Sequence, residues 1–175
     1  MQDIMQKAKQ IKLLLLDVDG VLTNGVIYYN DEGRVLKGFH IHDGLGLKLL
    51  HINNIETGII SAKHSEAVRH RAKELGINHV YLGQNDKLPA YDEIKKITGL
   101  DDNNIAYMGD DLPDLPILRR VGLAITVPQA TEIIQQNAHV VTKHKAGKGA
   151  VREACELILE AQGLLRKTLE SYLTG

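Results

Sequence analysis

Leu13-Leu14-Leu15-Leu16-Asp17-Val18-Asp19-Gly20-Val21 is the stretch of sequence that decides the fold. Its apolar residues end at Leu16 and form a short run that is typical of a fully buried strand. Asp17 and Asp19 follow at once, and residues two apart in an extended chain lie on the same side. Gly20 lets the chain turn and a ligand approach the backbone. The pattern predicts a carboxylate pair at the end of a buried strand, although Asp-rich turns also follow strands.

Strand and helix patterns alternate along the rest of the chain. Further strands are predicted at residues 56–61, 79–82, 104–108, 123–127 and 140–142. Helices are predicted at residues 43–52, 65–75 and 89–98, near Pro113, from Thr131, and over 150–173 with a break at Gly163. This alternation predicts an α/β fold with a doubly wound, mostly parallel sheet covered by helices on both faces. We expect residues 1–175 to form a single domain.

Two segments stand outside this alternation. Residues 26–29 and 35–39 flank a turn that ends at Gly33, which predicts a β-hairpin inserted at about residues 25–40. Residues 143–175 are expected to form a C-terminal loop and helix. Neither the stretch 20–43 nor the stretch 61–87 has room for a further domain above the site.

Composition narrows the possible partners. The 175 residues carry 21 Lys and Arg against 22 Asp and Glu, a net charge of −1, which argues against a nucleic-acid or membrane-surface protein. Cys155 is the only cysteine, so no internal disulfide can form, and we expect it to pack in a helix. Residues 1–10 are polar and amphipathic without the core of a signal peptide. We therefore expect a cytoplasmic protein.

Polar side chains follow the predicted strands where a parallel sheet binds its ligands, at the carboxyl ends. Carboxylates without a His or Cys partner favour an oxygen-loving ion, most simply Mg²⁺. A hydroxyl and a lysine suit the far side of a phosphate. A carboxylate nucleophile, a metal and such donors together indicate phosphoryl transfer through an aspartyl-phosphate. The residues concerned are Asp17, Asp19, Ser61, Lys87, Asp110 and Asp111.

Residues 17–25, Ser61, Lys87 and residues 109–114 resemble the four motifs of the haloacid dehalogenase superfamily. The resemblance implies that Asp17 is the nucleophile and a metal ligand. It implies that Asp19 is the acid–base residue and a metal ligand through its backbone carbonyl. It further implies that Asp110 completes the metal ligands and that Ser61 and Lys87 bind phosphate. Asp111 and Asp114 would be supporting residues, with Asp114 orienting Lys87.

Residues 39–46 and 146–153 extend the likeness to the 3-deoxy-D-manno-octulosonate 8-phosphate (KDO 8-phosphate) phosphatases, over nearly the whole chain. The resemblance implies a sugar-acid phosphate as substrate and a place in lipopolysaccharide biosynthesis. Two positions depart from the family pattern. Lys63 and Lys148 stand where an arginine is common, which replaces a planar bidentate group by a point charge. Candidate substrate contacts are His42, Asp43, Gly44, Lys63 and Lys148.

Superfamily members that act on small molecules usually cover the site with an inserted cap domain, and this chain has no room for one. Desolvation favours phosphoryl transfer, yet this chain has little with which to cover its own site. The apolar hairpin would make an aggregation-prone edge if it were left open. We expect hairpins of several subunits to associate, and the resemblance implies a homotetramer in which neighbouring subunits cap the site. The hairpin could instead fold back on its own domain.

Two other functions stay open. The same chemistry could act on another sugar phosphate, such as a nonulosonate 9-phosphate. Alternatively, the domain could be a non-catalytic oligomerisation or regulatory module. Asp17, Asp19, Lys87 and Asp110 argue against a non-catalytic module, because such a module has no need to hold four charges in one cleft. Repulsion among them without metal would cost stability.

Overall fold

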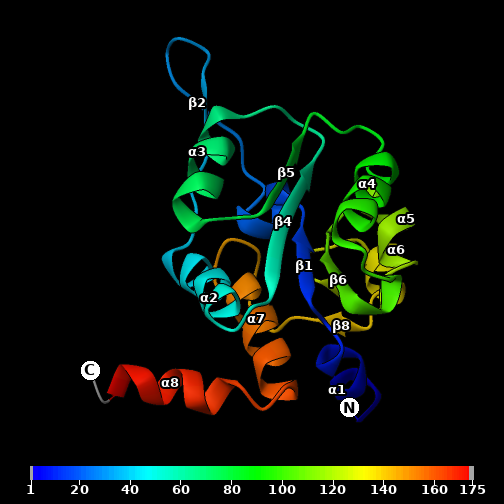
Figure 1. Ribbon diagram of the computed structural model, residues 1–175. Coiled ribbons are helices and arrows are strands. Elements are labelled where there is room, and N and C mark those ends of the chain that lie inside the picture. Colours follow the sequence, from blue (N-terminus) through cyan, green and yellow to red (C-terminus); the bar gives the residue numbers. More distant parts are fainter. Residues whose placement is uncertain (1, 174–175) are drawn as a thin grey trace.

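The computed structural model in Figure 1 describes residues 2–173. Six parallel strands form one sheet in the order β5-β4-β1-β6-β7-β8. This confirms the doubly wound α/β fold predicted from the sequence. The strands are β1 (Leu13–Leu16), β4 (Glu56–Ser61), β5 (His79–Leu82), β6 (Ile105–Met108), β7 (Leu123–Thr126) and β8 (Val140–Val141).

Helices cover the sheet on both sides (Figure 1), with α2, α3 and α7 on one side and α4, α5 and α6 on the other. The helices are α1 (Gln2–Lys9), α2 (Ile41–Ile52), α3 (Glu66–Leu75), α4 (Leu88–Thr98), α5 (Leu115–Leu118), α6 (Glu132–Gln136), α7 (Ala150–Ala161) and α8 (Leu165–Leu173). The predicted break at Gly163 separates α7 from α8, and this glycine has a φ of 71°. The sequence pattern did not predict α1 as a helix.

The core is aliphatic and centred on β1. Leu13, Leu14, Leu15 and Leu16 have no exposed surface, because β4 and β6 flank the strand and helices cover both faces. Cys155 is a free, fully buried cysteine inside α7, which confirms its predicted packing role. Within residues 2–173, no helix is both long and apolar enough to cross a membrane.

The predicted hairpin is present, but its strands are short. It consists of β2 (Tyr28–Tyr29) and β3 (Val35–Leu36), an antiparallel pair separate from the main sheet. The predicted strands were longer, at residues 26–29 and 35–39. An isolated two-stranded ribbon has no packed face to extend it. It projects from the top of the molecule, whereas α8 extends from the opposite end (Figure 1).

The chain reverses direction across the sheet at β1. From β1 it proceeds through β4 to β5 on one side, and then through β6 and β7 to β8 on the other. β1 and β6 therefore flank the topological switch point, where ligands bind in open α/β sheets. Asp17 follows β1 directly, and Asp110 lies two residues beyond the end of β6.

Candidate active site

A pocket of about 200 Å³ lies at the carboxyl ends of β1, β4 and β6. It brings together the predicted catalytic, phosphate-binding, metal-binding and supporting residues from all four motifs. Its lining consists of Asp17, Asp19, Ser61, Ala62, Lys63, Lys87, Asp110, Asp111, Pro113 and Asp114.

The backbone after β1 places Asp17 at the floor of the pocket. The Asp17 amide donates to the carbonyl of Met108 at 2.9 Å, which extends the sheet ladder by one residue. The chain then winds into a helical turn over Val18–Leu22 that is interrupted at Asp19 and Gly20. Gly20 has a φ of 91°, in the left-handed region where glycine is favoured. The turn leaves the Asp17 side chain at the sheet edge.

Lys87 lines the pocket as a buried cation. Its side chain is only 3% exposed, and its ammonium lies 2.8 Å from Asp17 Oδ1 and 2.6 Å from Asp114 Oδ1. Burial opposes its charge, but the carboxylates of Asp17 and Asp114 outweigh this effect and raise the pKa of Lys87. Lys87 is therefore a permanent positive charge next to Asp17.

Asp114 uses both of its carboxylate oxygens to organise the site. Besides Lys87, Oδ1 accepts a hydrogen bond from the Tyr107 hydroxyl at 2.5 Å. Oδ2 accepts from the backbone amides of Asp110 and Asp111 at 3.0 and 3.2 Å. These bonds fix the loop that carries Asp110, so Asp114 acts by positioning Lys87 and this loop.

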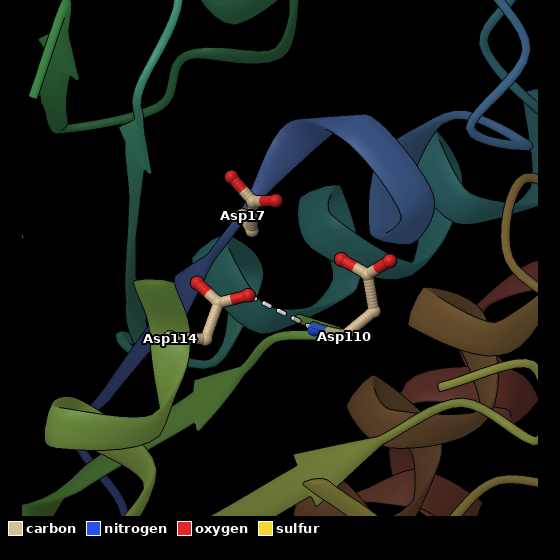
Figure 2. A group of neighbouring side chains, drawn as sticks. All are labelled: Asp17, Asp110 and Asp114. Carbon is tan, nitrogen blue, oxygen red and sulfur yellow. Dashed lines mark hydrogen bonds between the residues drawn. The ribbon is translucent and has the colours of Figure 1, made fainter. Parts of the chain in front are cut away.

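Three carboxylates converge beside this lysine. Asp17, Asp110 and Asp114 each place an oxygen within 4.8 Å of the others, and Figure 2 shows the three side chains around a shared space. Because Asp114 already has four hydrogen-bond donors, Asp17 and Asp110 are the groups with capacity for a cation. Asp110 Oδ1 is buried and has no hydrogen-bond partner among the described residues. A hard cation would satisfy that oxygen, so the residues fit Mg²⁺.

Burial and the crowding of carboxylates in this pocket raise the pKa values of Asp17 and Asp110. Burial, followed by the nearby Asp114 carboxylate, raises the pKa of Asp17 to about 6. Burial and the carboxylates of Asp17 and Asp114 raise the pKa of Asp110 to about 7. Without a cation, the folded protein therefore disfavours the ionised form of both groups.

This crowding predicts a pH-dependent response to Mg²⁺. A raised folded-state pKa contributes stability at low pH that is lost as the pH rises through about 6 to 7 for Asp17 and Asp110. Mg²⁺ should restore it, so millimolar Mg²⁺ should raise the melting temperature more at pH 8 than at pH 5. Asp110→Asn should be more stable than wild type at pH 8 in EDTA and should respond little to Mg²⁺. Thermal denaturation with and without EDTA measures this, and a wild-type melting temperature unaffected by Mg²⁺ would contradict it.

Gly20 packs closely against the carboxylate of Asp110. A Cβ at this position would lie 2.0 Å from Asp110 Oδ2, with a φ of 91° besides. We expect Gly20→Ala to displace Asp110 and to abolish both the Mg²⁺-induced rise in melting temperature and phosphate release. Gly99→Ala is the matched control, because Gly99 also has a positive φ, 67°, but a Cβ there would meet nothing within 4 Å. It should cost about 1–2 kcal/mol of stability and keep the Mg²⁺ response. Equal behaviour of the two variants would contradict the prediction.

Ser61 and Asp19 also line the pocket. Ser61 ends β4 and is 3% exposed, and its hydroxyl accepts from the Lys63 amide at 3.4 Å. The Asp19 side chain is 27% exposed and pairs with Lys37. Its carboxylate does not belong to the group of oxygens formed by Asp17, Asp110 and Asp114.

The five predicted substrate contacts divide into three groups. Lys63 lines the pocket and is exposed. His42 and Lys148 are exposed but do not line it, and Gly44 is buried. Asp43 is 1% exposed, and its carboxylate accepts from the amides of Arg152 at 2.8 Å and Gly149 at 3.3 Å. Asp43 therefore ties α2 to the start of α7, and contact with substrate stays a prediction without geometric support.

Sequence reasoning missed two residues that shape the site. Tyr107 is completely buried, and its hydroxyl binds Asp114. Tyr107 could have been found from the sequence, because a tyrosine hydroxyl inside an otherwise apolar strand requires a polar partner when it is buried. Lys37 leaves the hairpin and pairs with Asp19, a contact across 18 residues that no local pattern indicates.

The fold, the acidic cluster and the buried lysine define a phosphoryl-transfer hydrolase, and comparisons with known proteins agree. Residues 51–154 match the haloacid dehalogenase-like hydrolases. The Yersinia pestis 3-deoxy-D-manno-octulosonate 8-phosphate phosphatase is 44% identical over 163 residues, or 93% of this chain and 87% of that protein. The Escherichia coli K12 protein of the same name is 42% identical with the same coverage. The chain belongs to the haloacid dehalogenase-like hydrolases.

Solved structures narrow the family further. A Moraxella catarrhalis 3-deoxy-D-manno-octulosonate 8-phosphate phosphatase in complex with magnesium ion, phosphate ion and KDO has a TM-score of 0.96 at 45% identity. The match covers 98% of this chain and 99% of that chain. The cobalt-bound phosphatase of Haemophilus influenzae has a TM-score of 0.91 at 36% identity, with 96% and 99% covered. Within the hydrolases, this chain therefore belongs with the 3-deoxy-D-manno-octulosonate 8-phosphate phosphatases.

Proposed function

We propose that the protein is a Mg²⁺-dependent phosphatase that hydrolyses KDO 8-phosphate to KDO and inorganic phosphate. One observation carries the proposal: Asp17 lies between the buried ammonium of Lys87 and the carboxylate of Asp110, one oxygen of which has no partner in the described part of the chain. We infer the substrate from the relatives, because their names specify this ester. The product would serve lipopolysaccharide biosynthesis, and we place the reaction in the cytoplasm.

The residues divide the reaction between them. Asp17 attacks the phosphorus, and the ester bond to the sugar oxygen breaks as the aspartyl-phosphate forms. Asp19 gives its proton to the leaving alkoxide. Its carboxylate then takes a proton from a water whose oxygen attacks the same phosphorus, which releases phosphate and restores Asp17. Ser61 and Lys87 bind the phosphoryl oxygens on which charge accumulates.

Asp17, Asp110 and the backbone carbonyl of Asp19 would hold Mg²⁺. The ion would neutralise the phosphate and Asp17, so that the two anions can approach each other. Asp111 and Asp114 support these groups, and Lys63 lies at the mouth of the pocket. There it suits an anionic group of the sugar acid as a point charge.

A panel of substrates tests the reaction and its specificity. Phosphate release with Mg²⁺ should be much faster with KDO 8-phosphate than with a nonulosonate 9-phosphate or with neutral sugar phosphates. Broad and weak turnover would keep the chemistry and contradict the substrate. No turnover of any ester would favour the non-catalytic oligomerisation or regulatory reading.

The assembly that we propose is a homotetramer whose hairpins meet at its centre, with neighbouring subunits capping the site. The apolar surface of the hairpin supports this, because a projecting ribbon with so many exposed apolar side chains needs a partner. Exposed fractions run from 42% for Val35 to 67% for Tyr29. The exposed apolar residues are Val26, Ile27, Tyr28, Tyr29, Val35 and Leu36.

A charge on this hairpin should dissociate the tetramer. We expect Tyr29→Asp to shift the mass in sedimentation velocity from tetramer towards monomer or dimer, because burying an unpaired carboxylate is costly. Ile97→Asp is the control, since Ile97 is 61% exposed on α4, away from the hairpin. A wild-type monomer, or a Tyr29→Asp variant that stays tetrameric, would contradict the proposed assembly.

A further inference from the structure

Lys37 is the only hydrogen-bonding partner of the Asp19 side chain within residues 2–173. It follows β3 directly, and its ammonium contacts Asp19 Oδ1. The Lys37 side chain is only 6% exposed, although most of the hairpin before it is exposed. Burying an ammonium is costly unless a partner compensates, so this contact is more strongly maintained than a surface ion pair.

The contact with Lys37 distinguishes the Asp19 carboxylate from the carboxylates that face the cation site. Lys37 contacts Oδ1 of Asp19, and Oδ2 has no hydrogen-bond partner among residues 2–173. Asp17 and Asp110 face the cation site instead, and Asp19 stays outside their group. A free carboxylate two residues from Asp17 would be attracted to any divalent cation bound there. Ligation through the Asp19 side chain would occupy the group that must move protons.

We propose that Lys37 is a positioning residue that keeps the Asp19 carboxylate out of the cation site and leaves its second oxygen available for proton transfer. This inference rests on the acid–base role of Asp19 in the proposed function. It also connects the hairpin to the chemistry, because the same segment carries the apolar surface and Lys37. Anything that holds the hairpin in place thereby holds Asp19.

Leaving groups of different basicity give the first test. An alkoxide needs a proton as it leaves, whereas p-nitrophenolate does not. Lys37→Met should lower kcat/KM for KDO 8-phosphate by roughly 10- to 100-fold, part of the 10²–10⁴ that general acid catalysis contributes. It should change kcat/KM for p-nitrophenyl phosphate less than about threefold, because kcat/KM reports the formation of the aspartyl-phosphate, whereas kcat also includes its hydrolysis, which needs Asp19 as base with either ester. Lys37→Arg should restore most of the loss, and Lys48→Met, which removes an exposed lysine of α2, should behave as wild type.

These outcomes separate the inference from the function on which it rests. Equal losses of kcat/KM with both esters would overturn the inference, and so would a raised KM with unchanged kcat for KDO 8-phosphate, which would make Lys37 a substrate contact. If wild type hydrolyses neither ester, the proposed function itself fails.

A second measurement does not depend on turnover. If Lys37 keeps Asp19 away from the cation, Lys37→Met should lower the Mg²⁺ concentration that gives a half-maximal rise in melting temperature. The same substitution in an Asp19→Asn background should have no such effect, because the carboxylate that would join the site is gone. An equal shift in both backgrounds would reduce the role of Lys37 to its charge alone and overturn the inference.

Discussion

Asp17→Asn should abolish phosphate release while the protein stays folded. An amide cannot form the acyl-phosphate, and loss of a covalent nucleophile can cost on the order of 10⁶-fold in kcat. The variant also removes a crowded carboxylate, since burial and Asp114 raise the pKa of Asp17 to about 6. The metal-free variant should therefore be no less stable than wild type at pH 8. Phosphate release in Mg²⁺ and thermal denaturation in EDTA measure the two effects.

The control for this prediction is Asp101→Asn, which makes the same chemical change at an exposed residue far from the pocket lining. It should keep the activity of wild type. Turnover by Asp17→Asn within tenfold of wild type would contradict the role of Asp17 as nucleophile.

Lys87→Met should cause the largest loss of stability together with loss of activity. Lys87 is the cation that Asp17 and Asp114 share, and removing one partner of a buried ion pair typically costs about 3–5 kcal/mol. Both carboxylates would then remain close together without compensation, and the phosphate would lose a donor. Denaturant unfolding in EDTA should show the loss, and Mg²⁺ should recover part of it through Asp17.

Lys95→Met is the matched control. Lys95 also pairs with an aspartate, Asp102, at 2.5 Å, but its side chain is 24% exposed and the pair lies on another part of the fold. Partly exposed pairs contribute about 0.2–1 kcal/mol. If both variants lost the same small amount of stability, Lys87 would not be the central cation that its geometry indicates.

The parts of the structure that could be predicted are those specified by local pattern. The apolar run before Asp17 is typical of a buried strand, and each predicted motif residue lies at or beyond the carboxyl end of a strand of the parallel sheet. The edge at which the strands end then brings Asp17, Ser61 and Asp110 to one pocket. The topology of the sheet therefore predicts that these residues share a site, even though no contact between them is known from the sequence.

The parts that could not be predicted depend on contacts between distant residues. Asp43 lies in the first turn of α2, but its partners are Gly149 and Arg152, more than 100 positions away. The partnership of Lys37 with Asp19 depends on the path of a hairpin that joins no other sheet. Such contacts arise from packing, which neither periodicity nor turn chemistry encodes.

Trapping the covalent intermediate would test the central claim most directly. Wild-type protein would be mixed with KDO 8-phosphate and Mg²⁺, quenched in acid within milliseconds and treated with borohydride, which reduces an aspartyl-phosphate to homoserine. Peptide mass spectrometry should find homoserine at residue 17, and none when substrate is omitted. Turnover of the ester with no modification at residue 17, or with the modification at Asp19 or Asp110, would contradict the account.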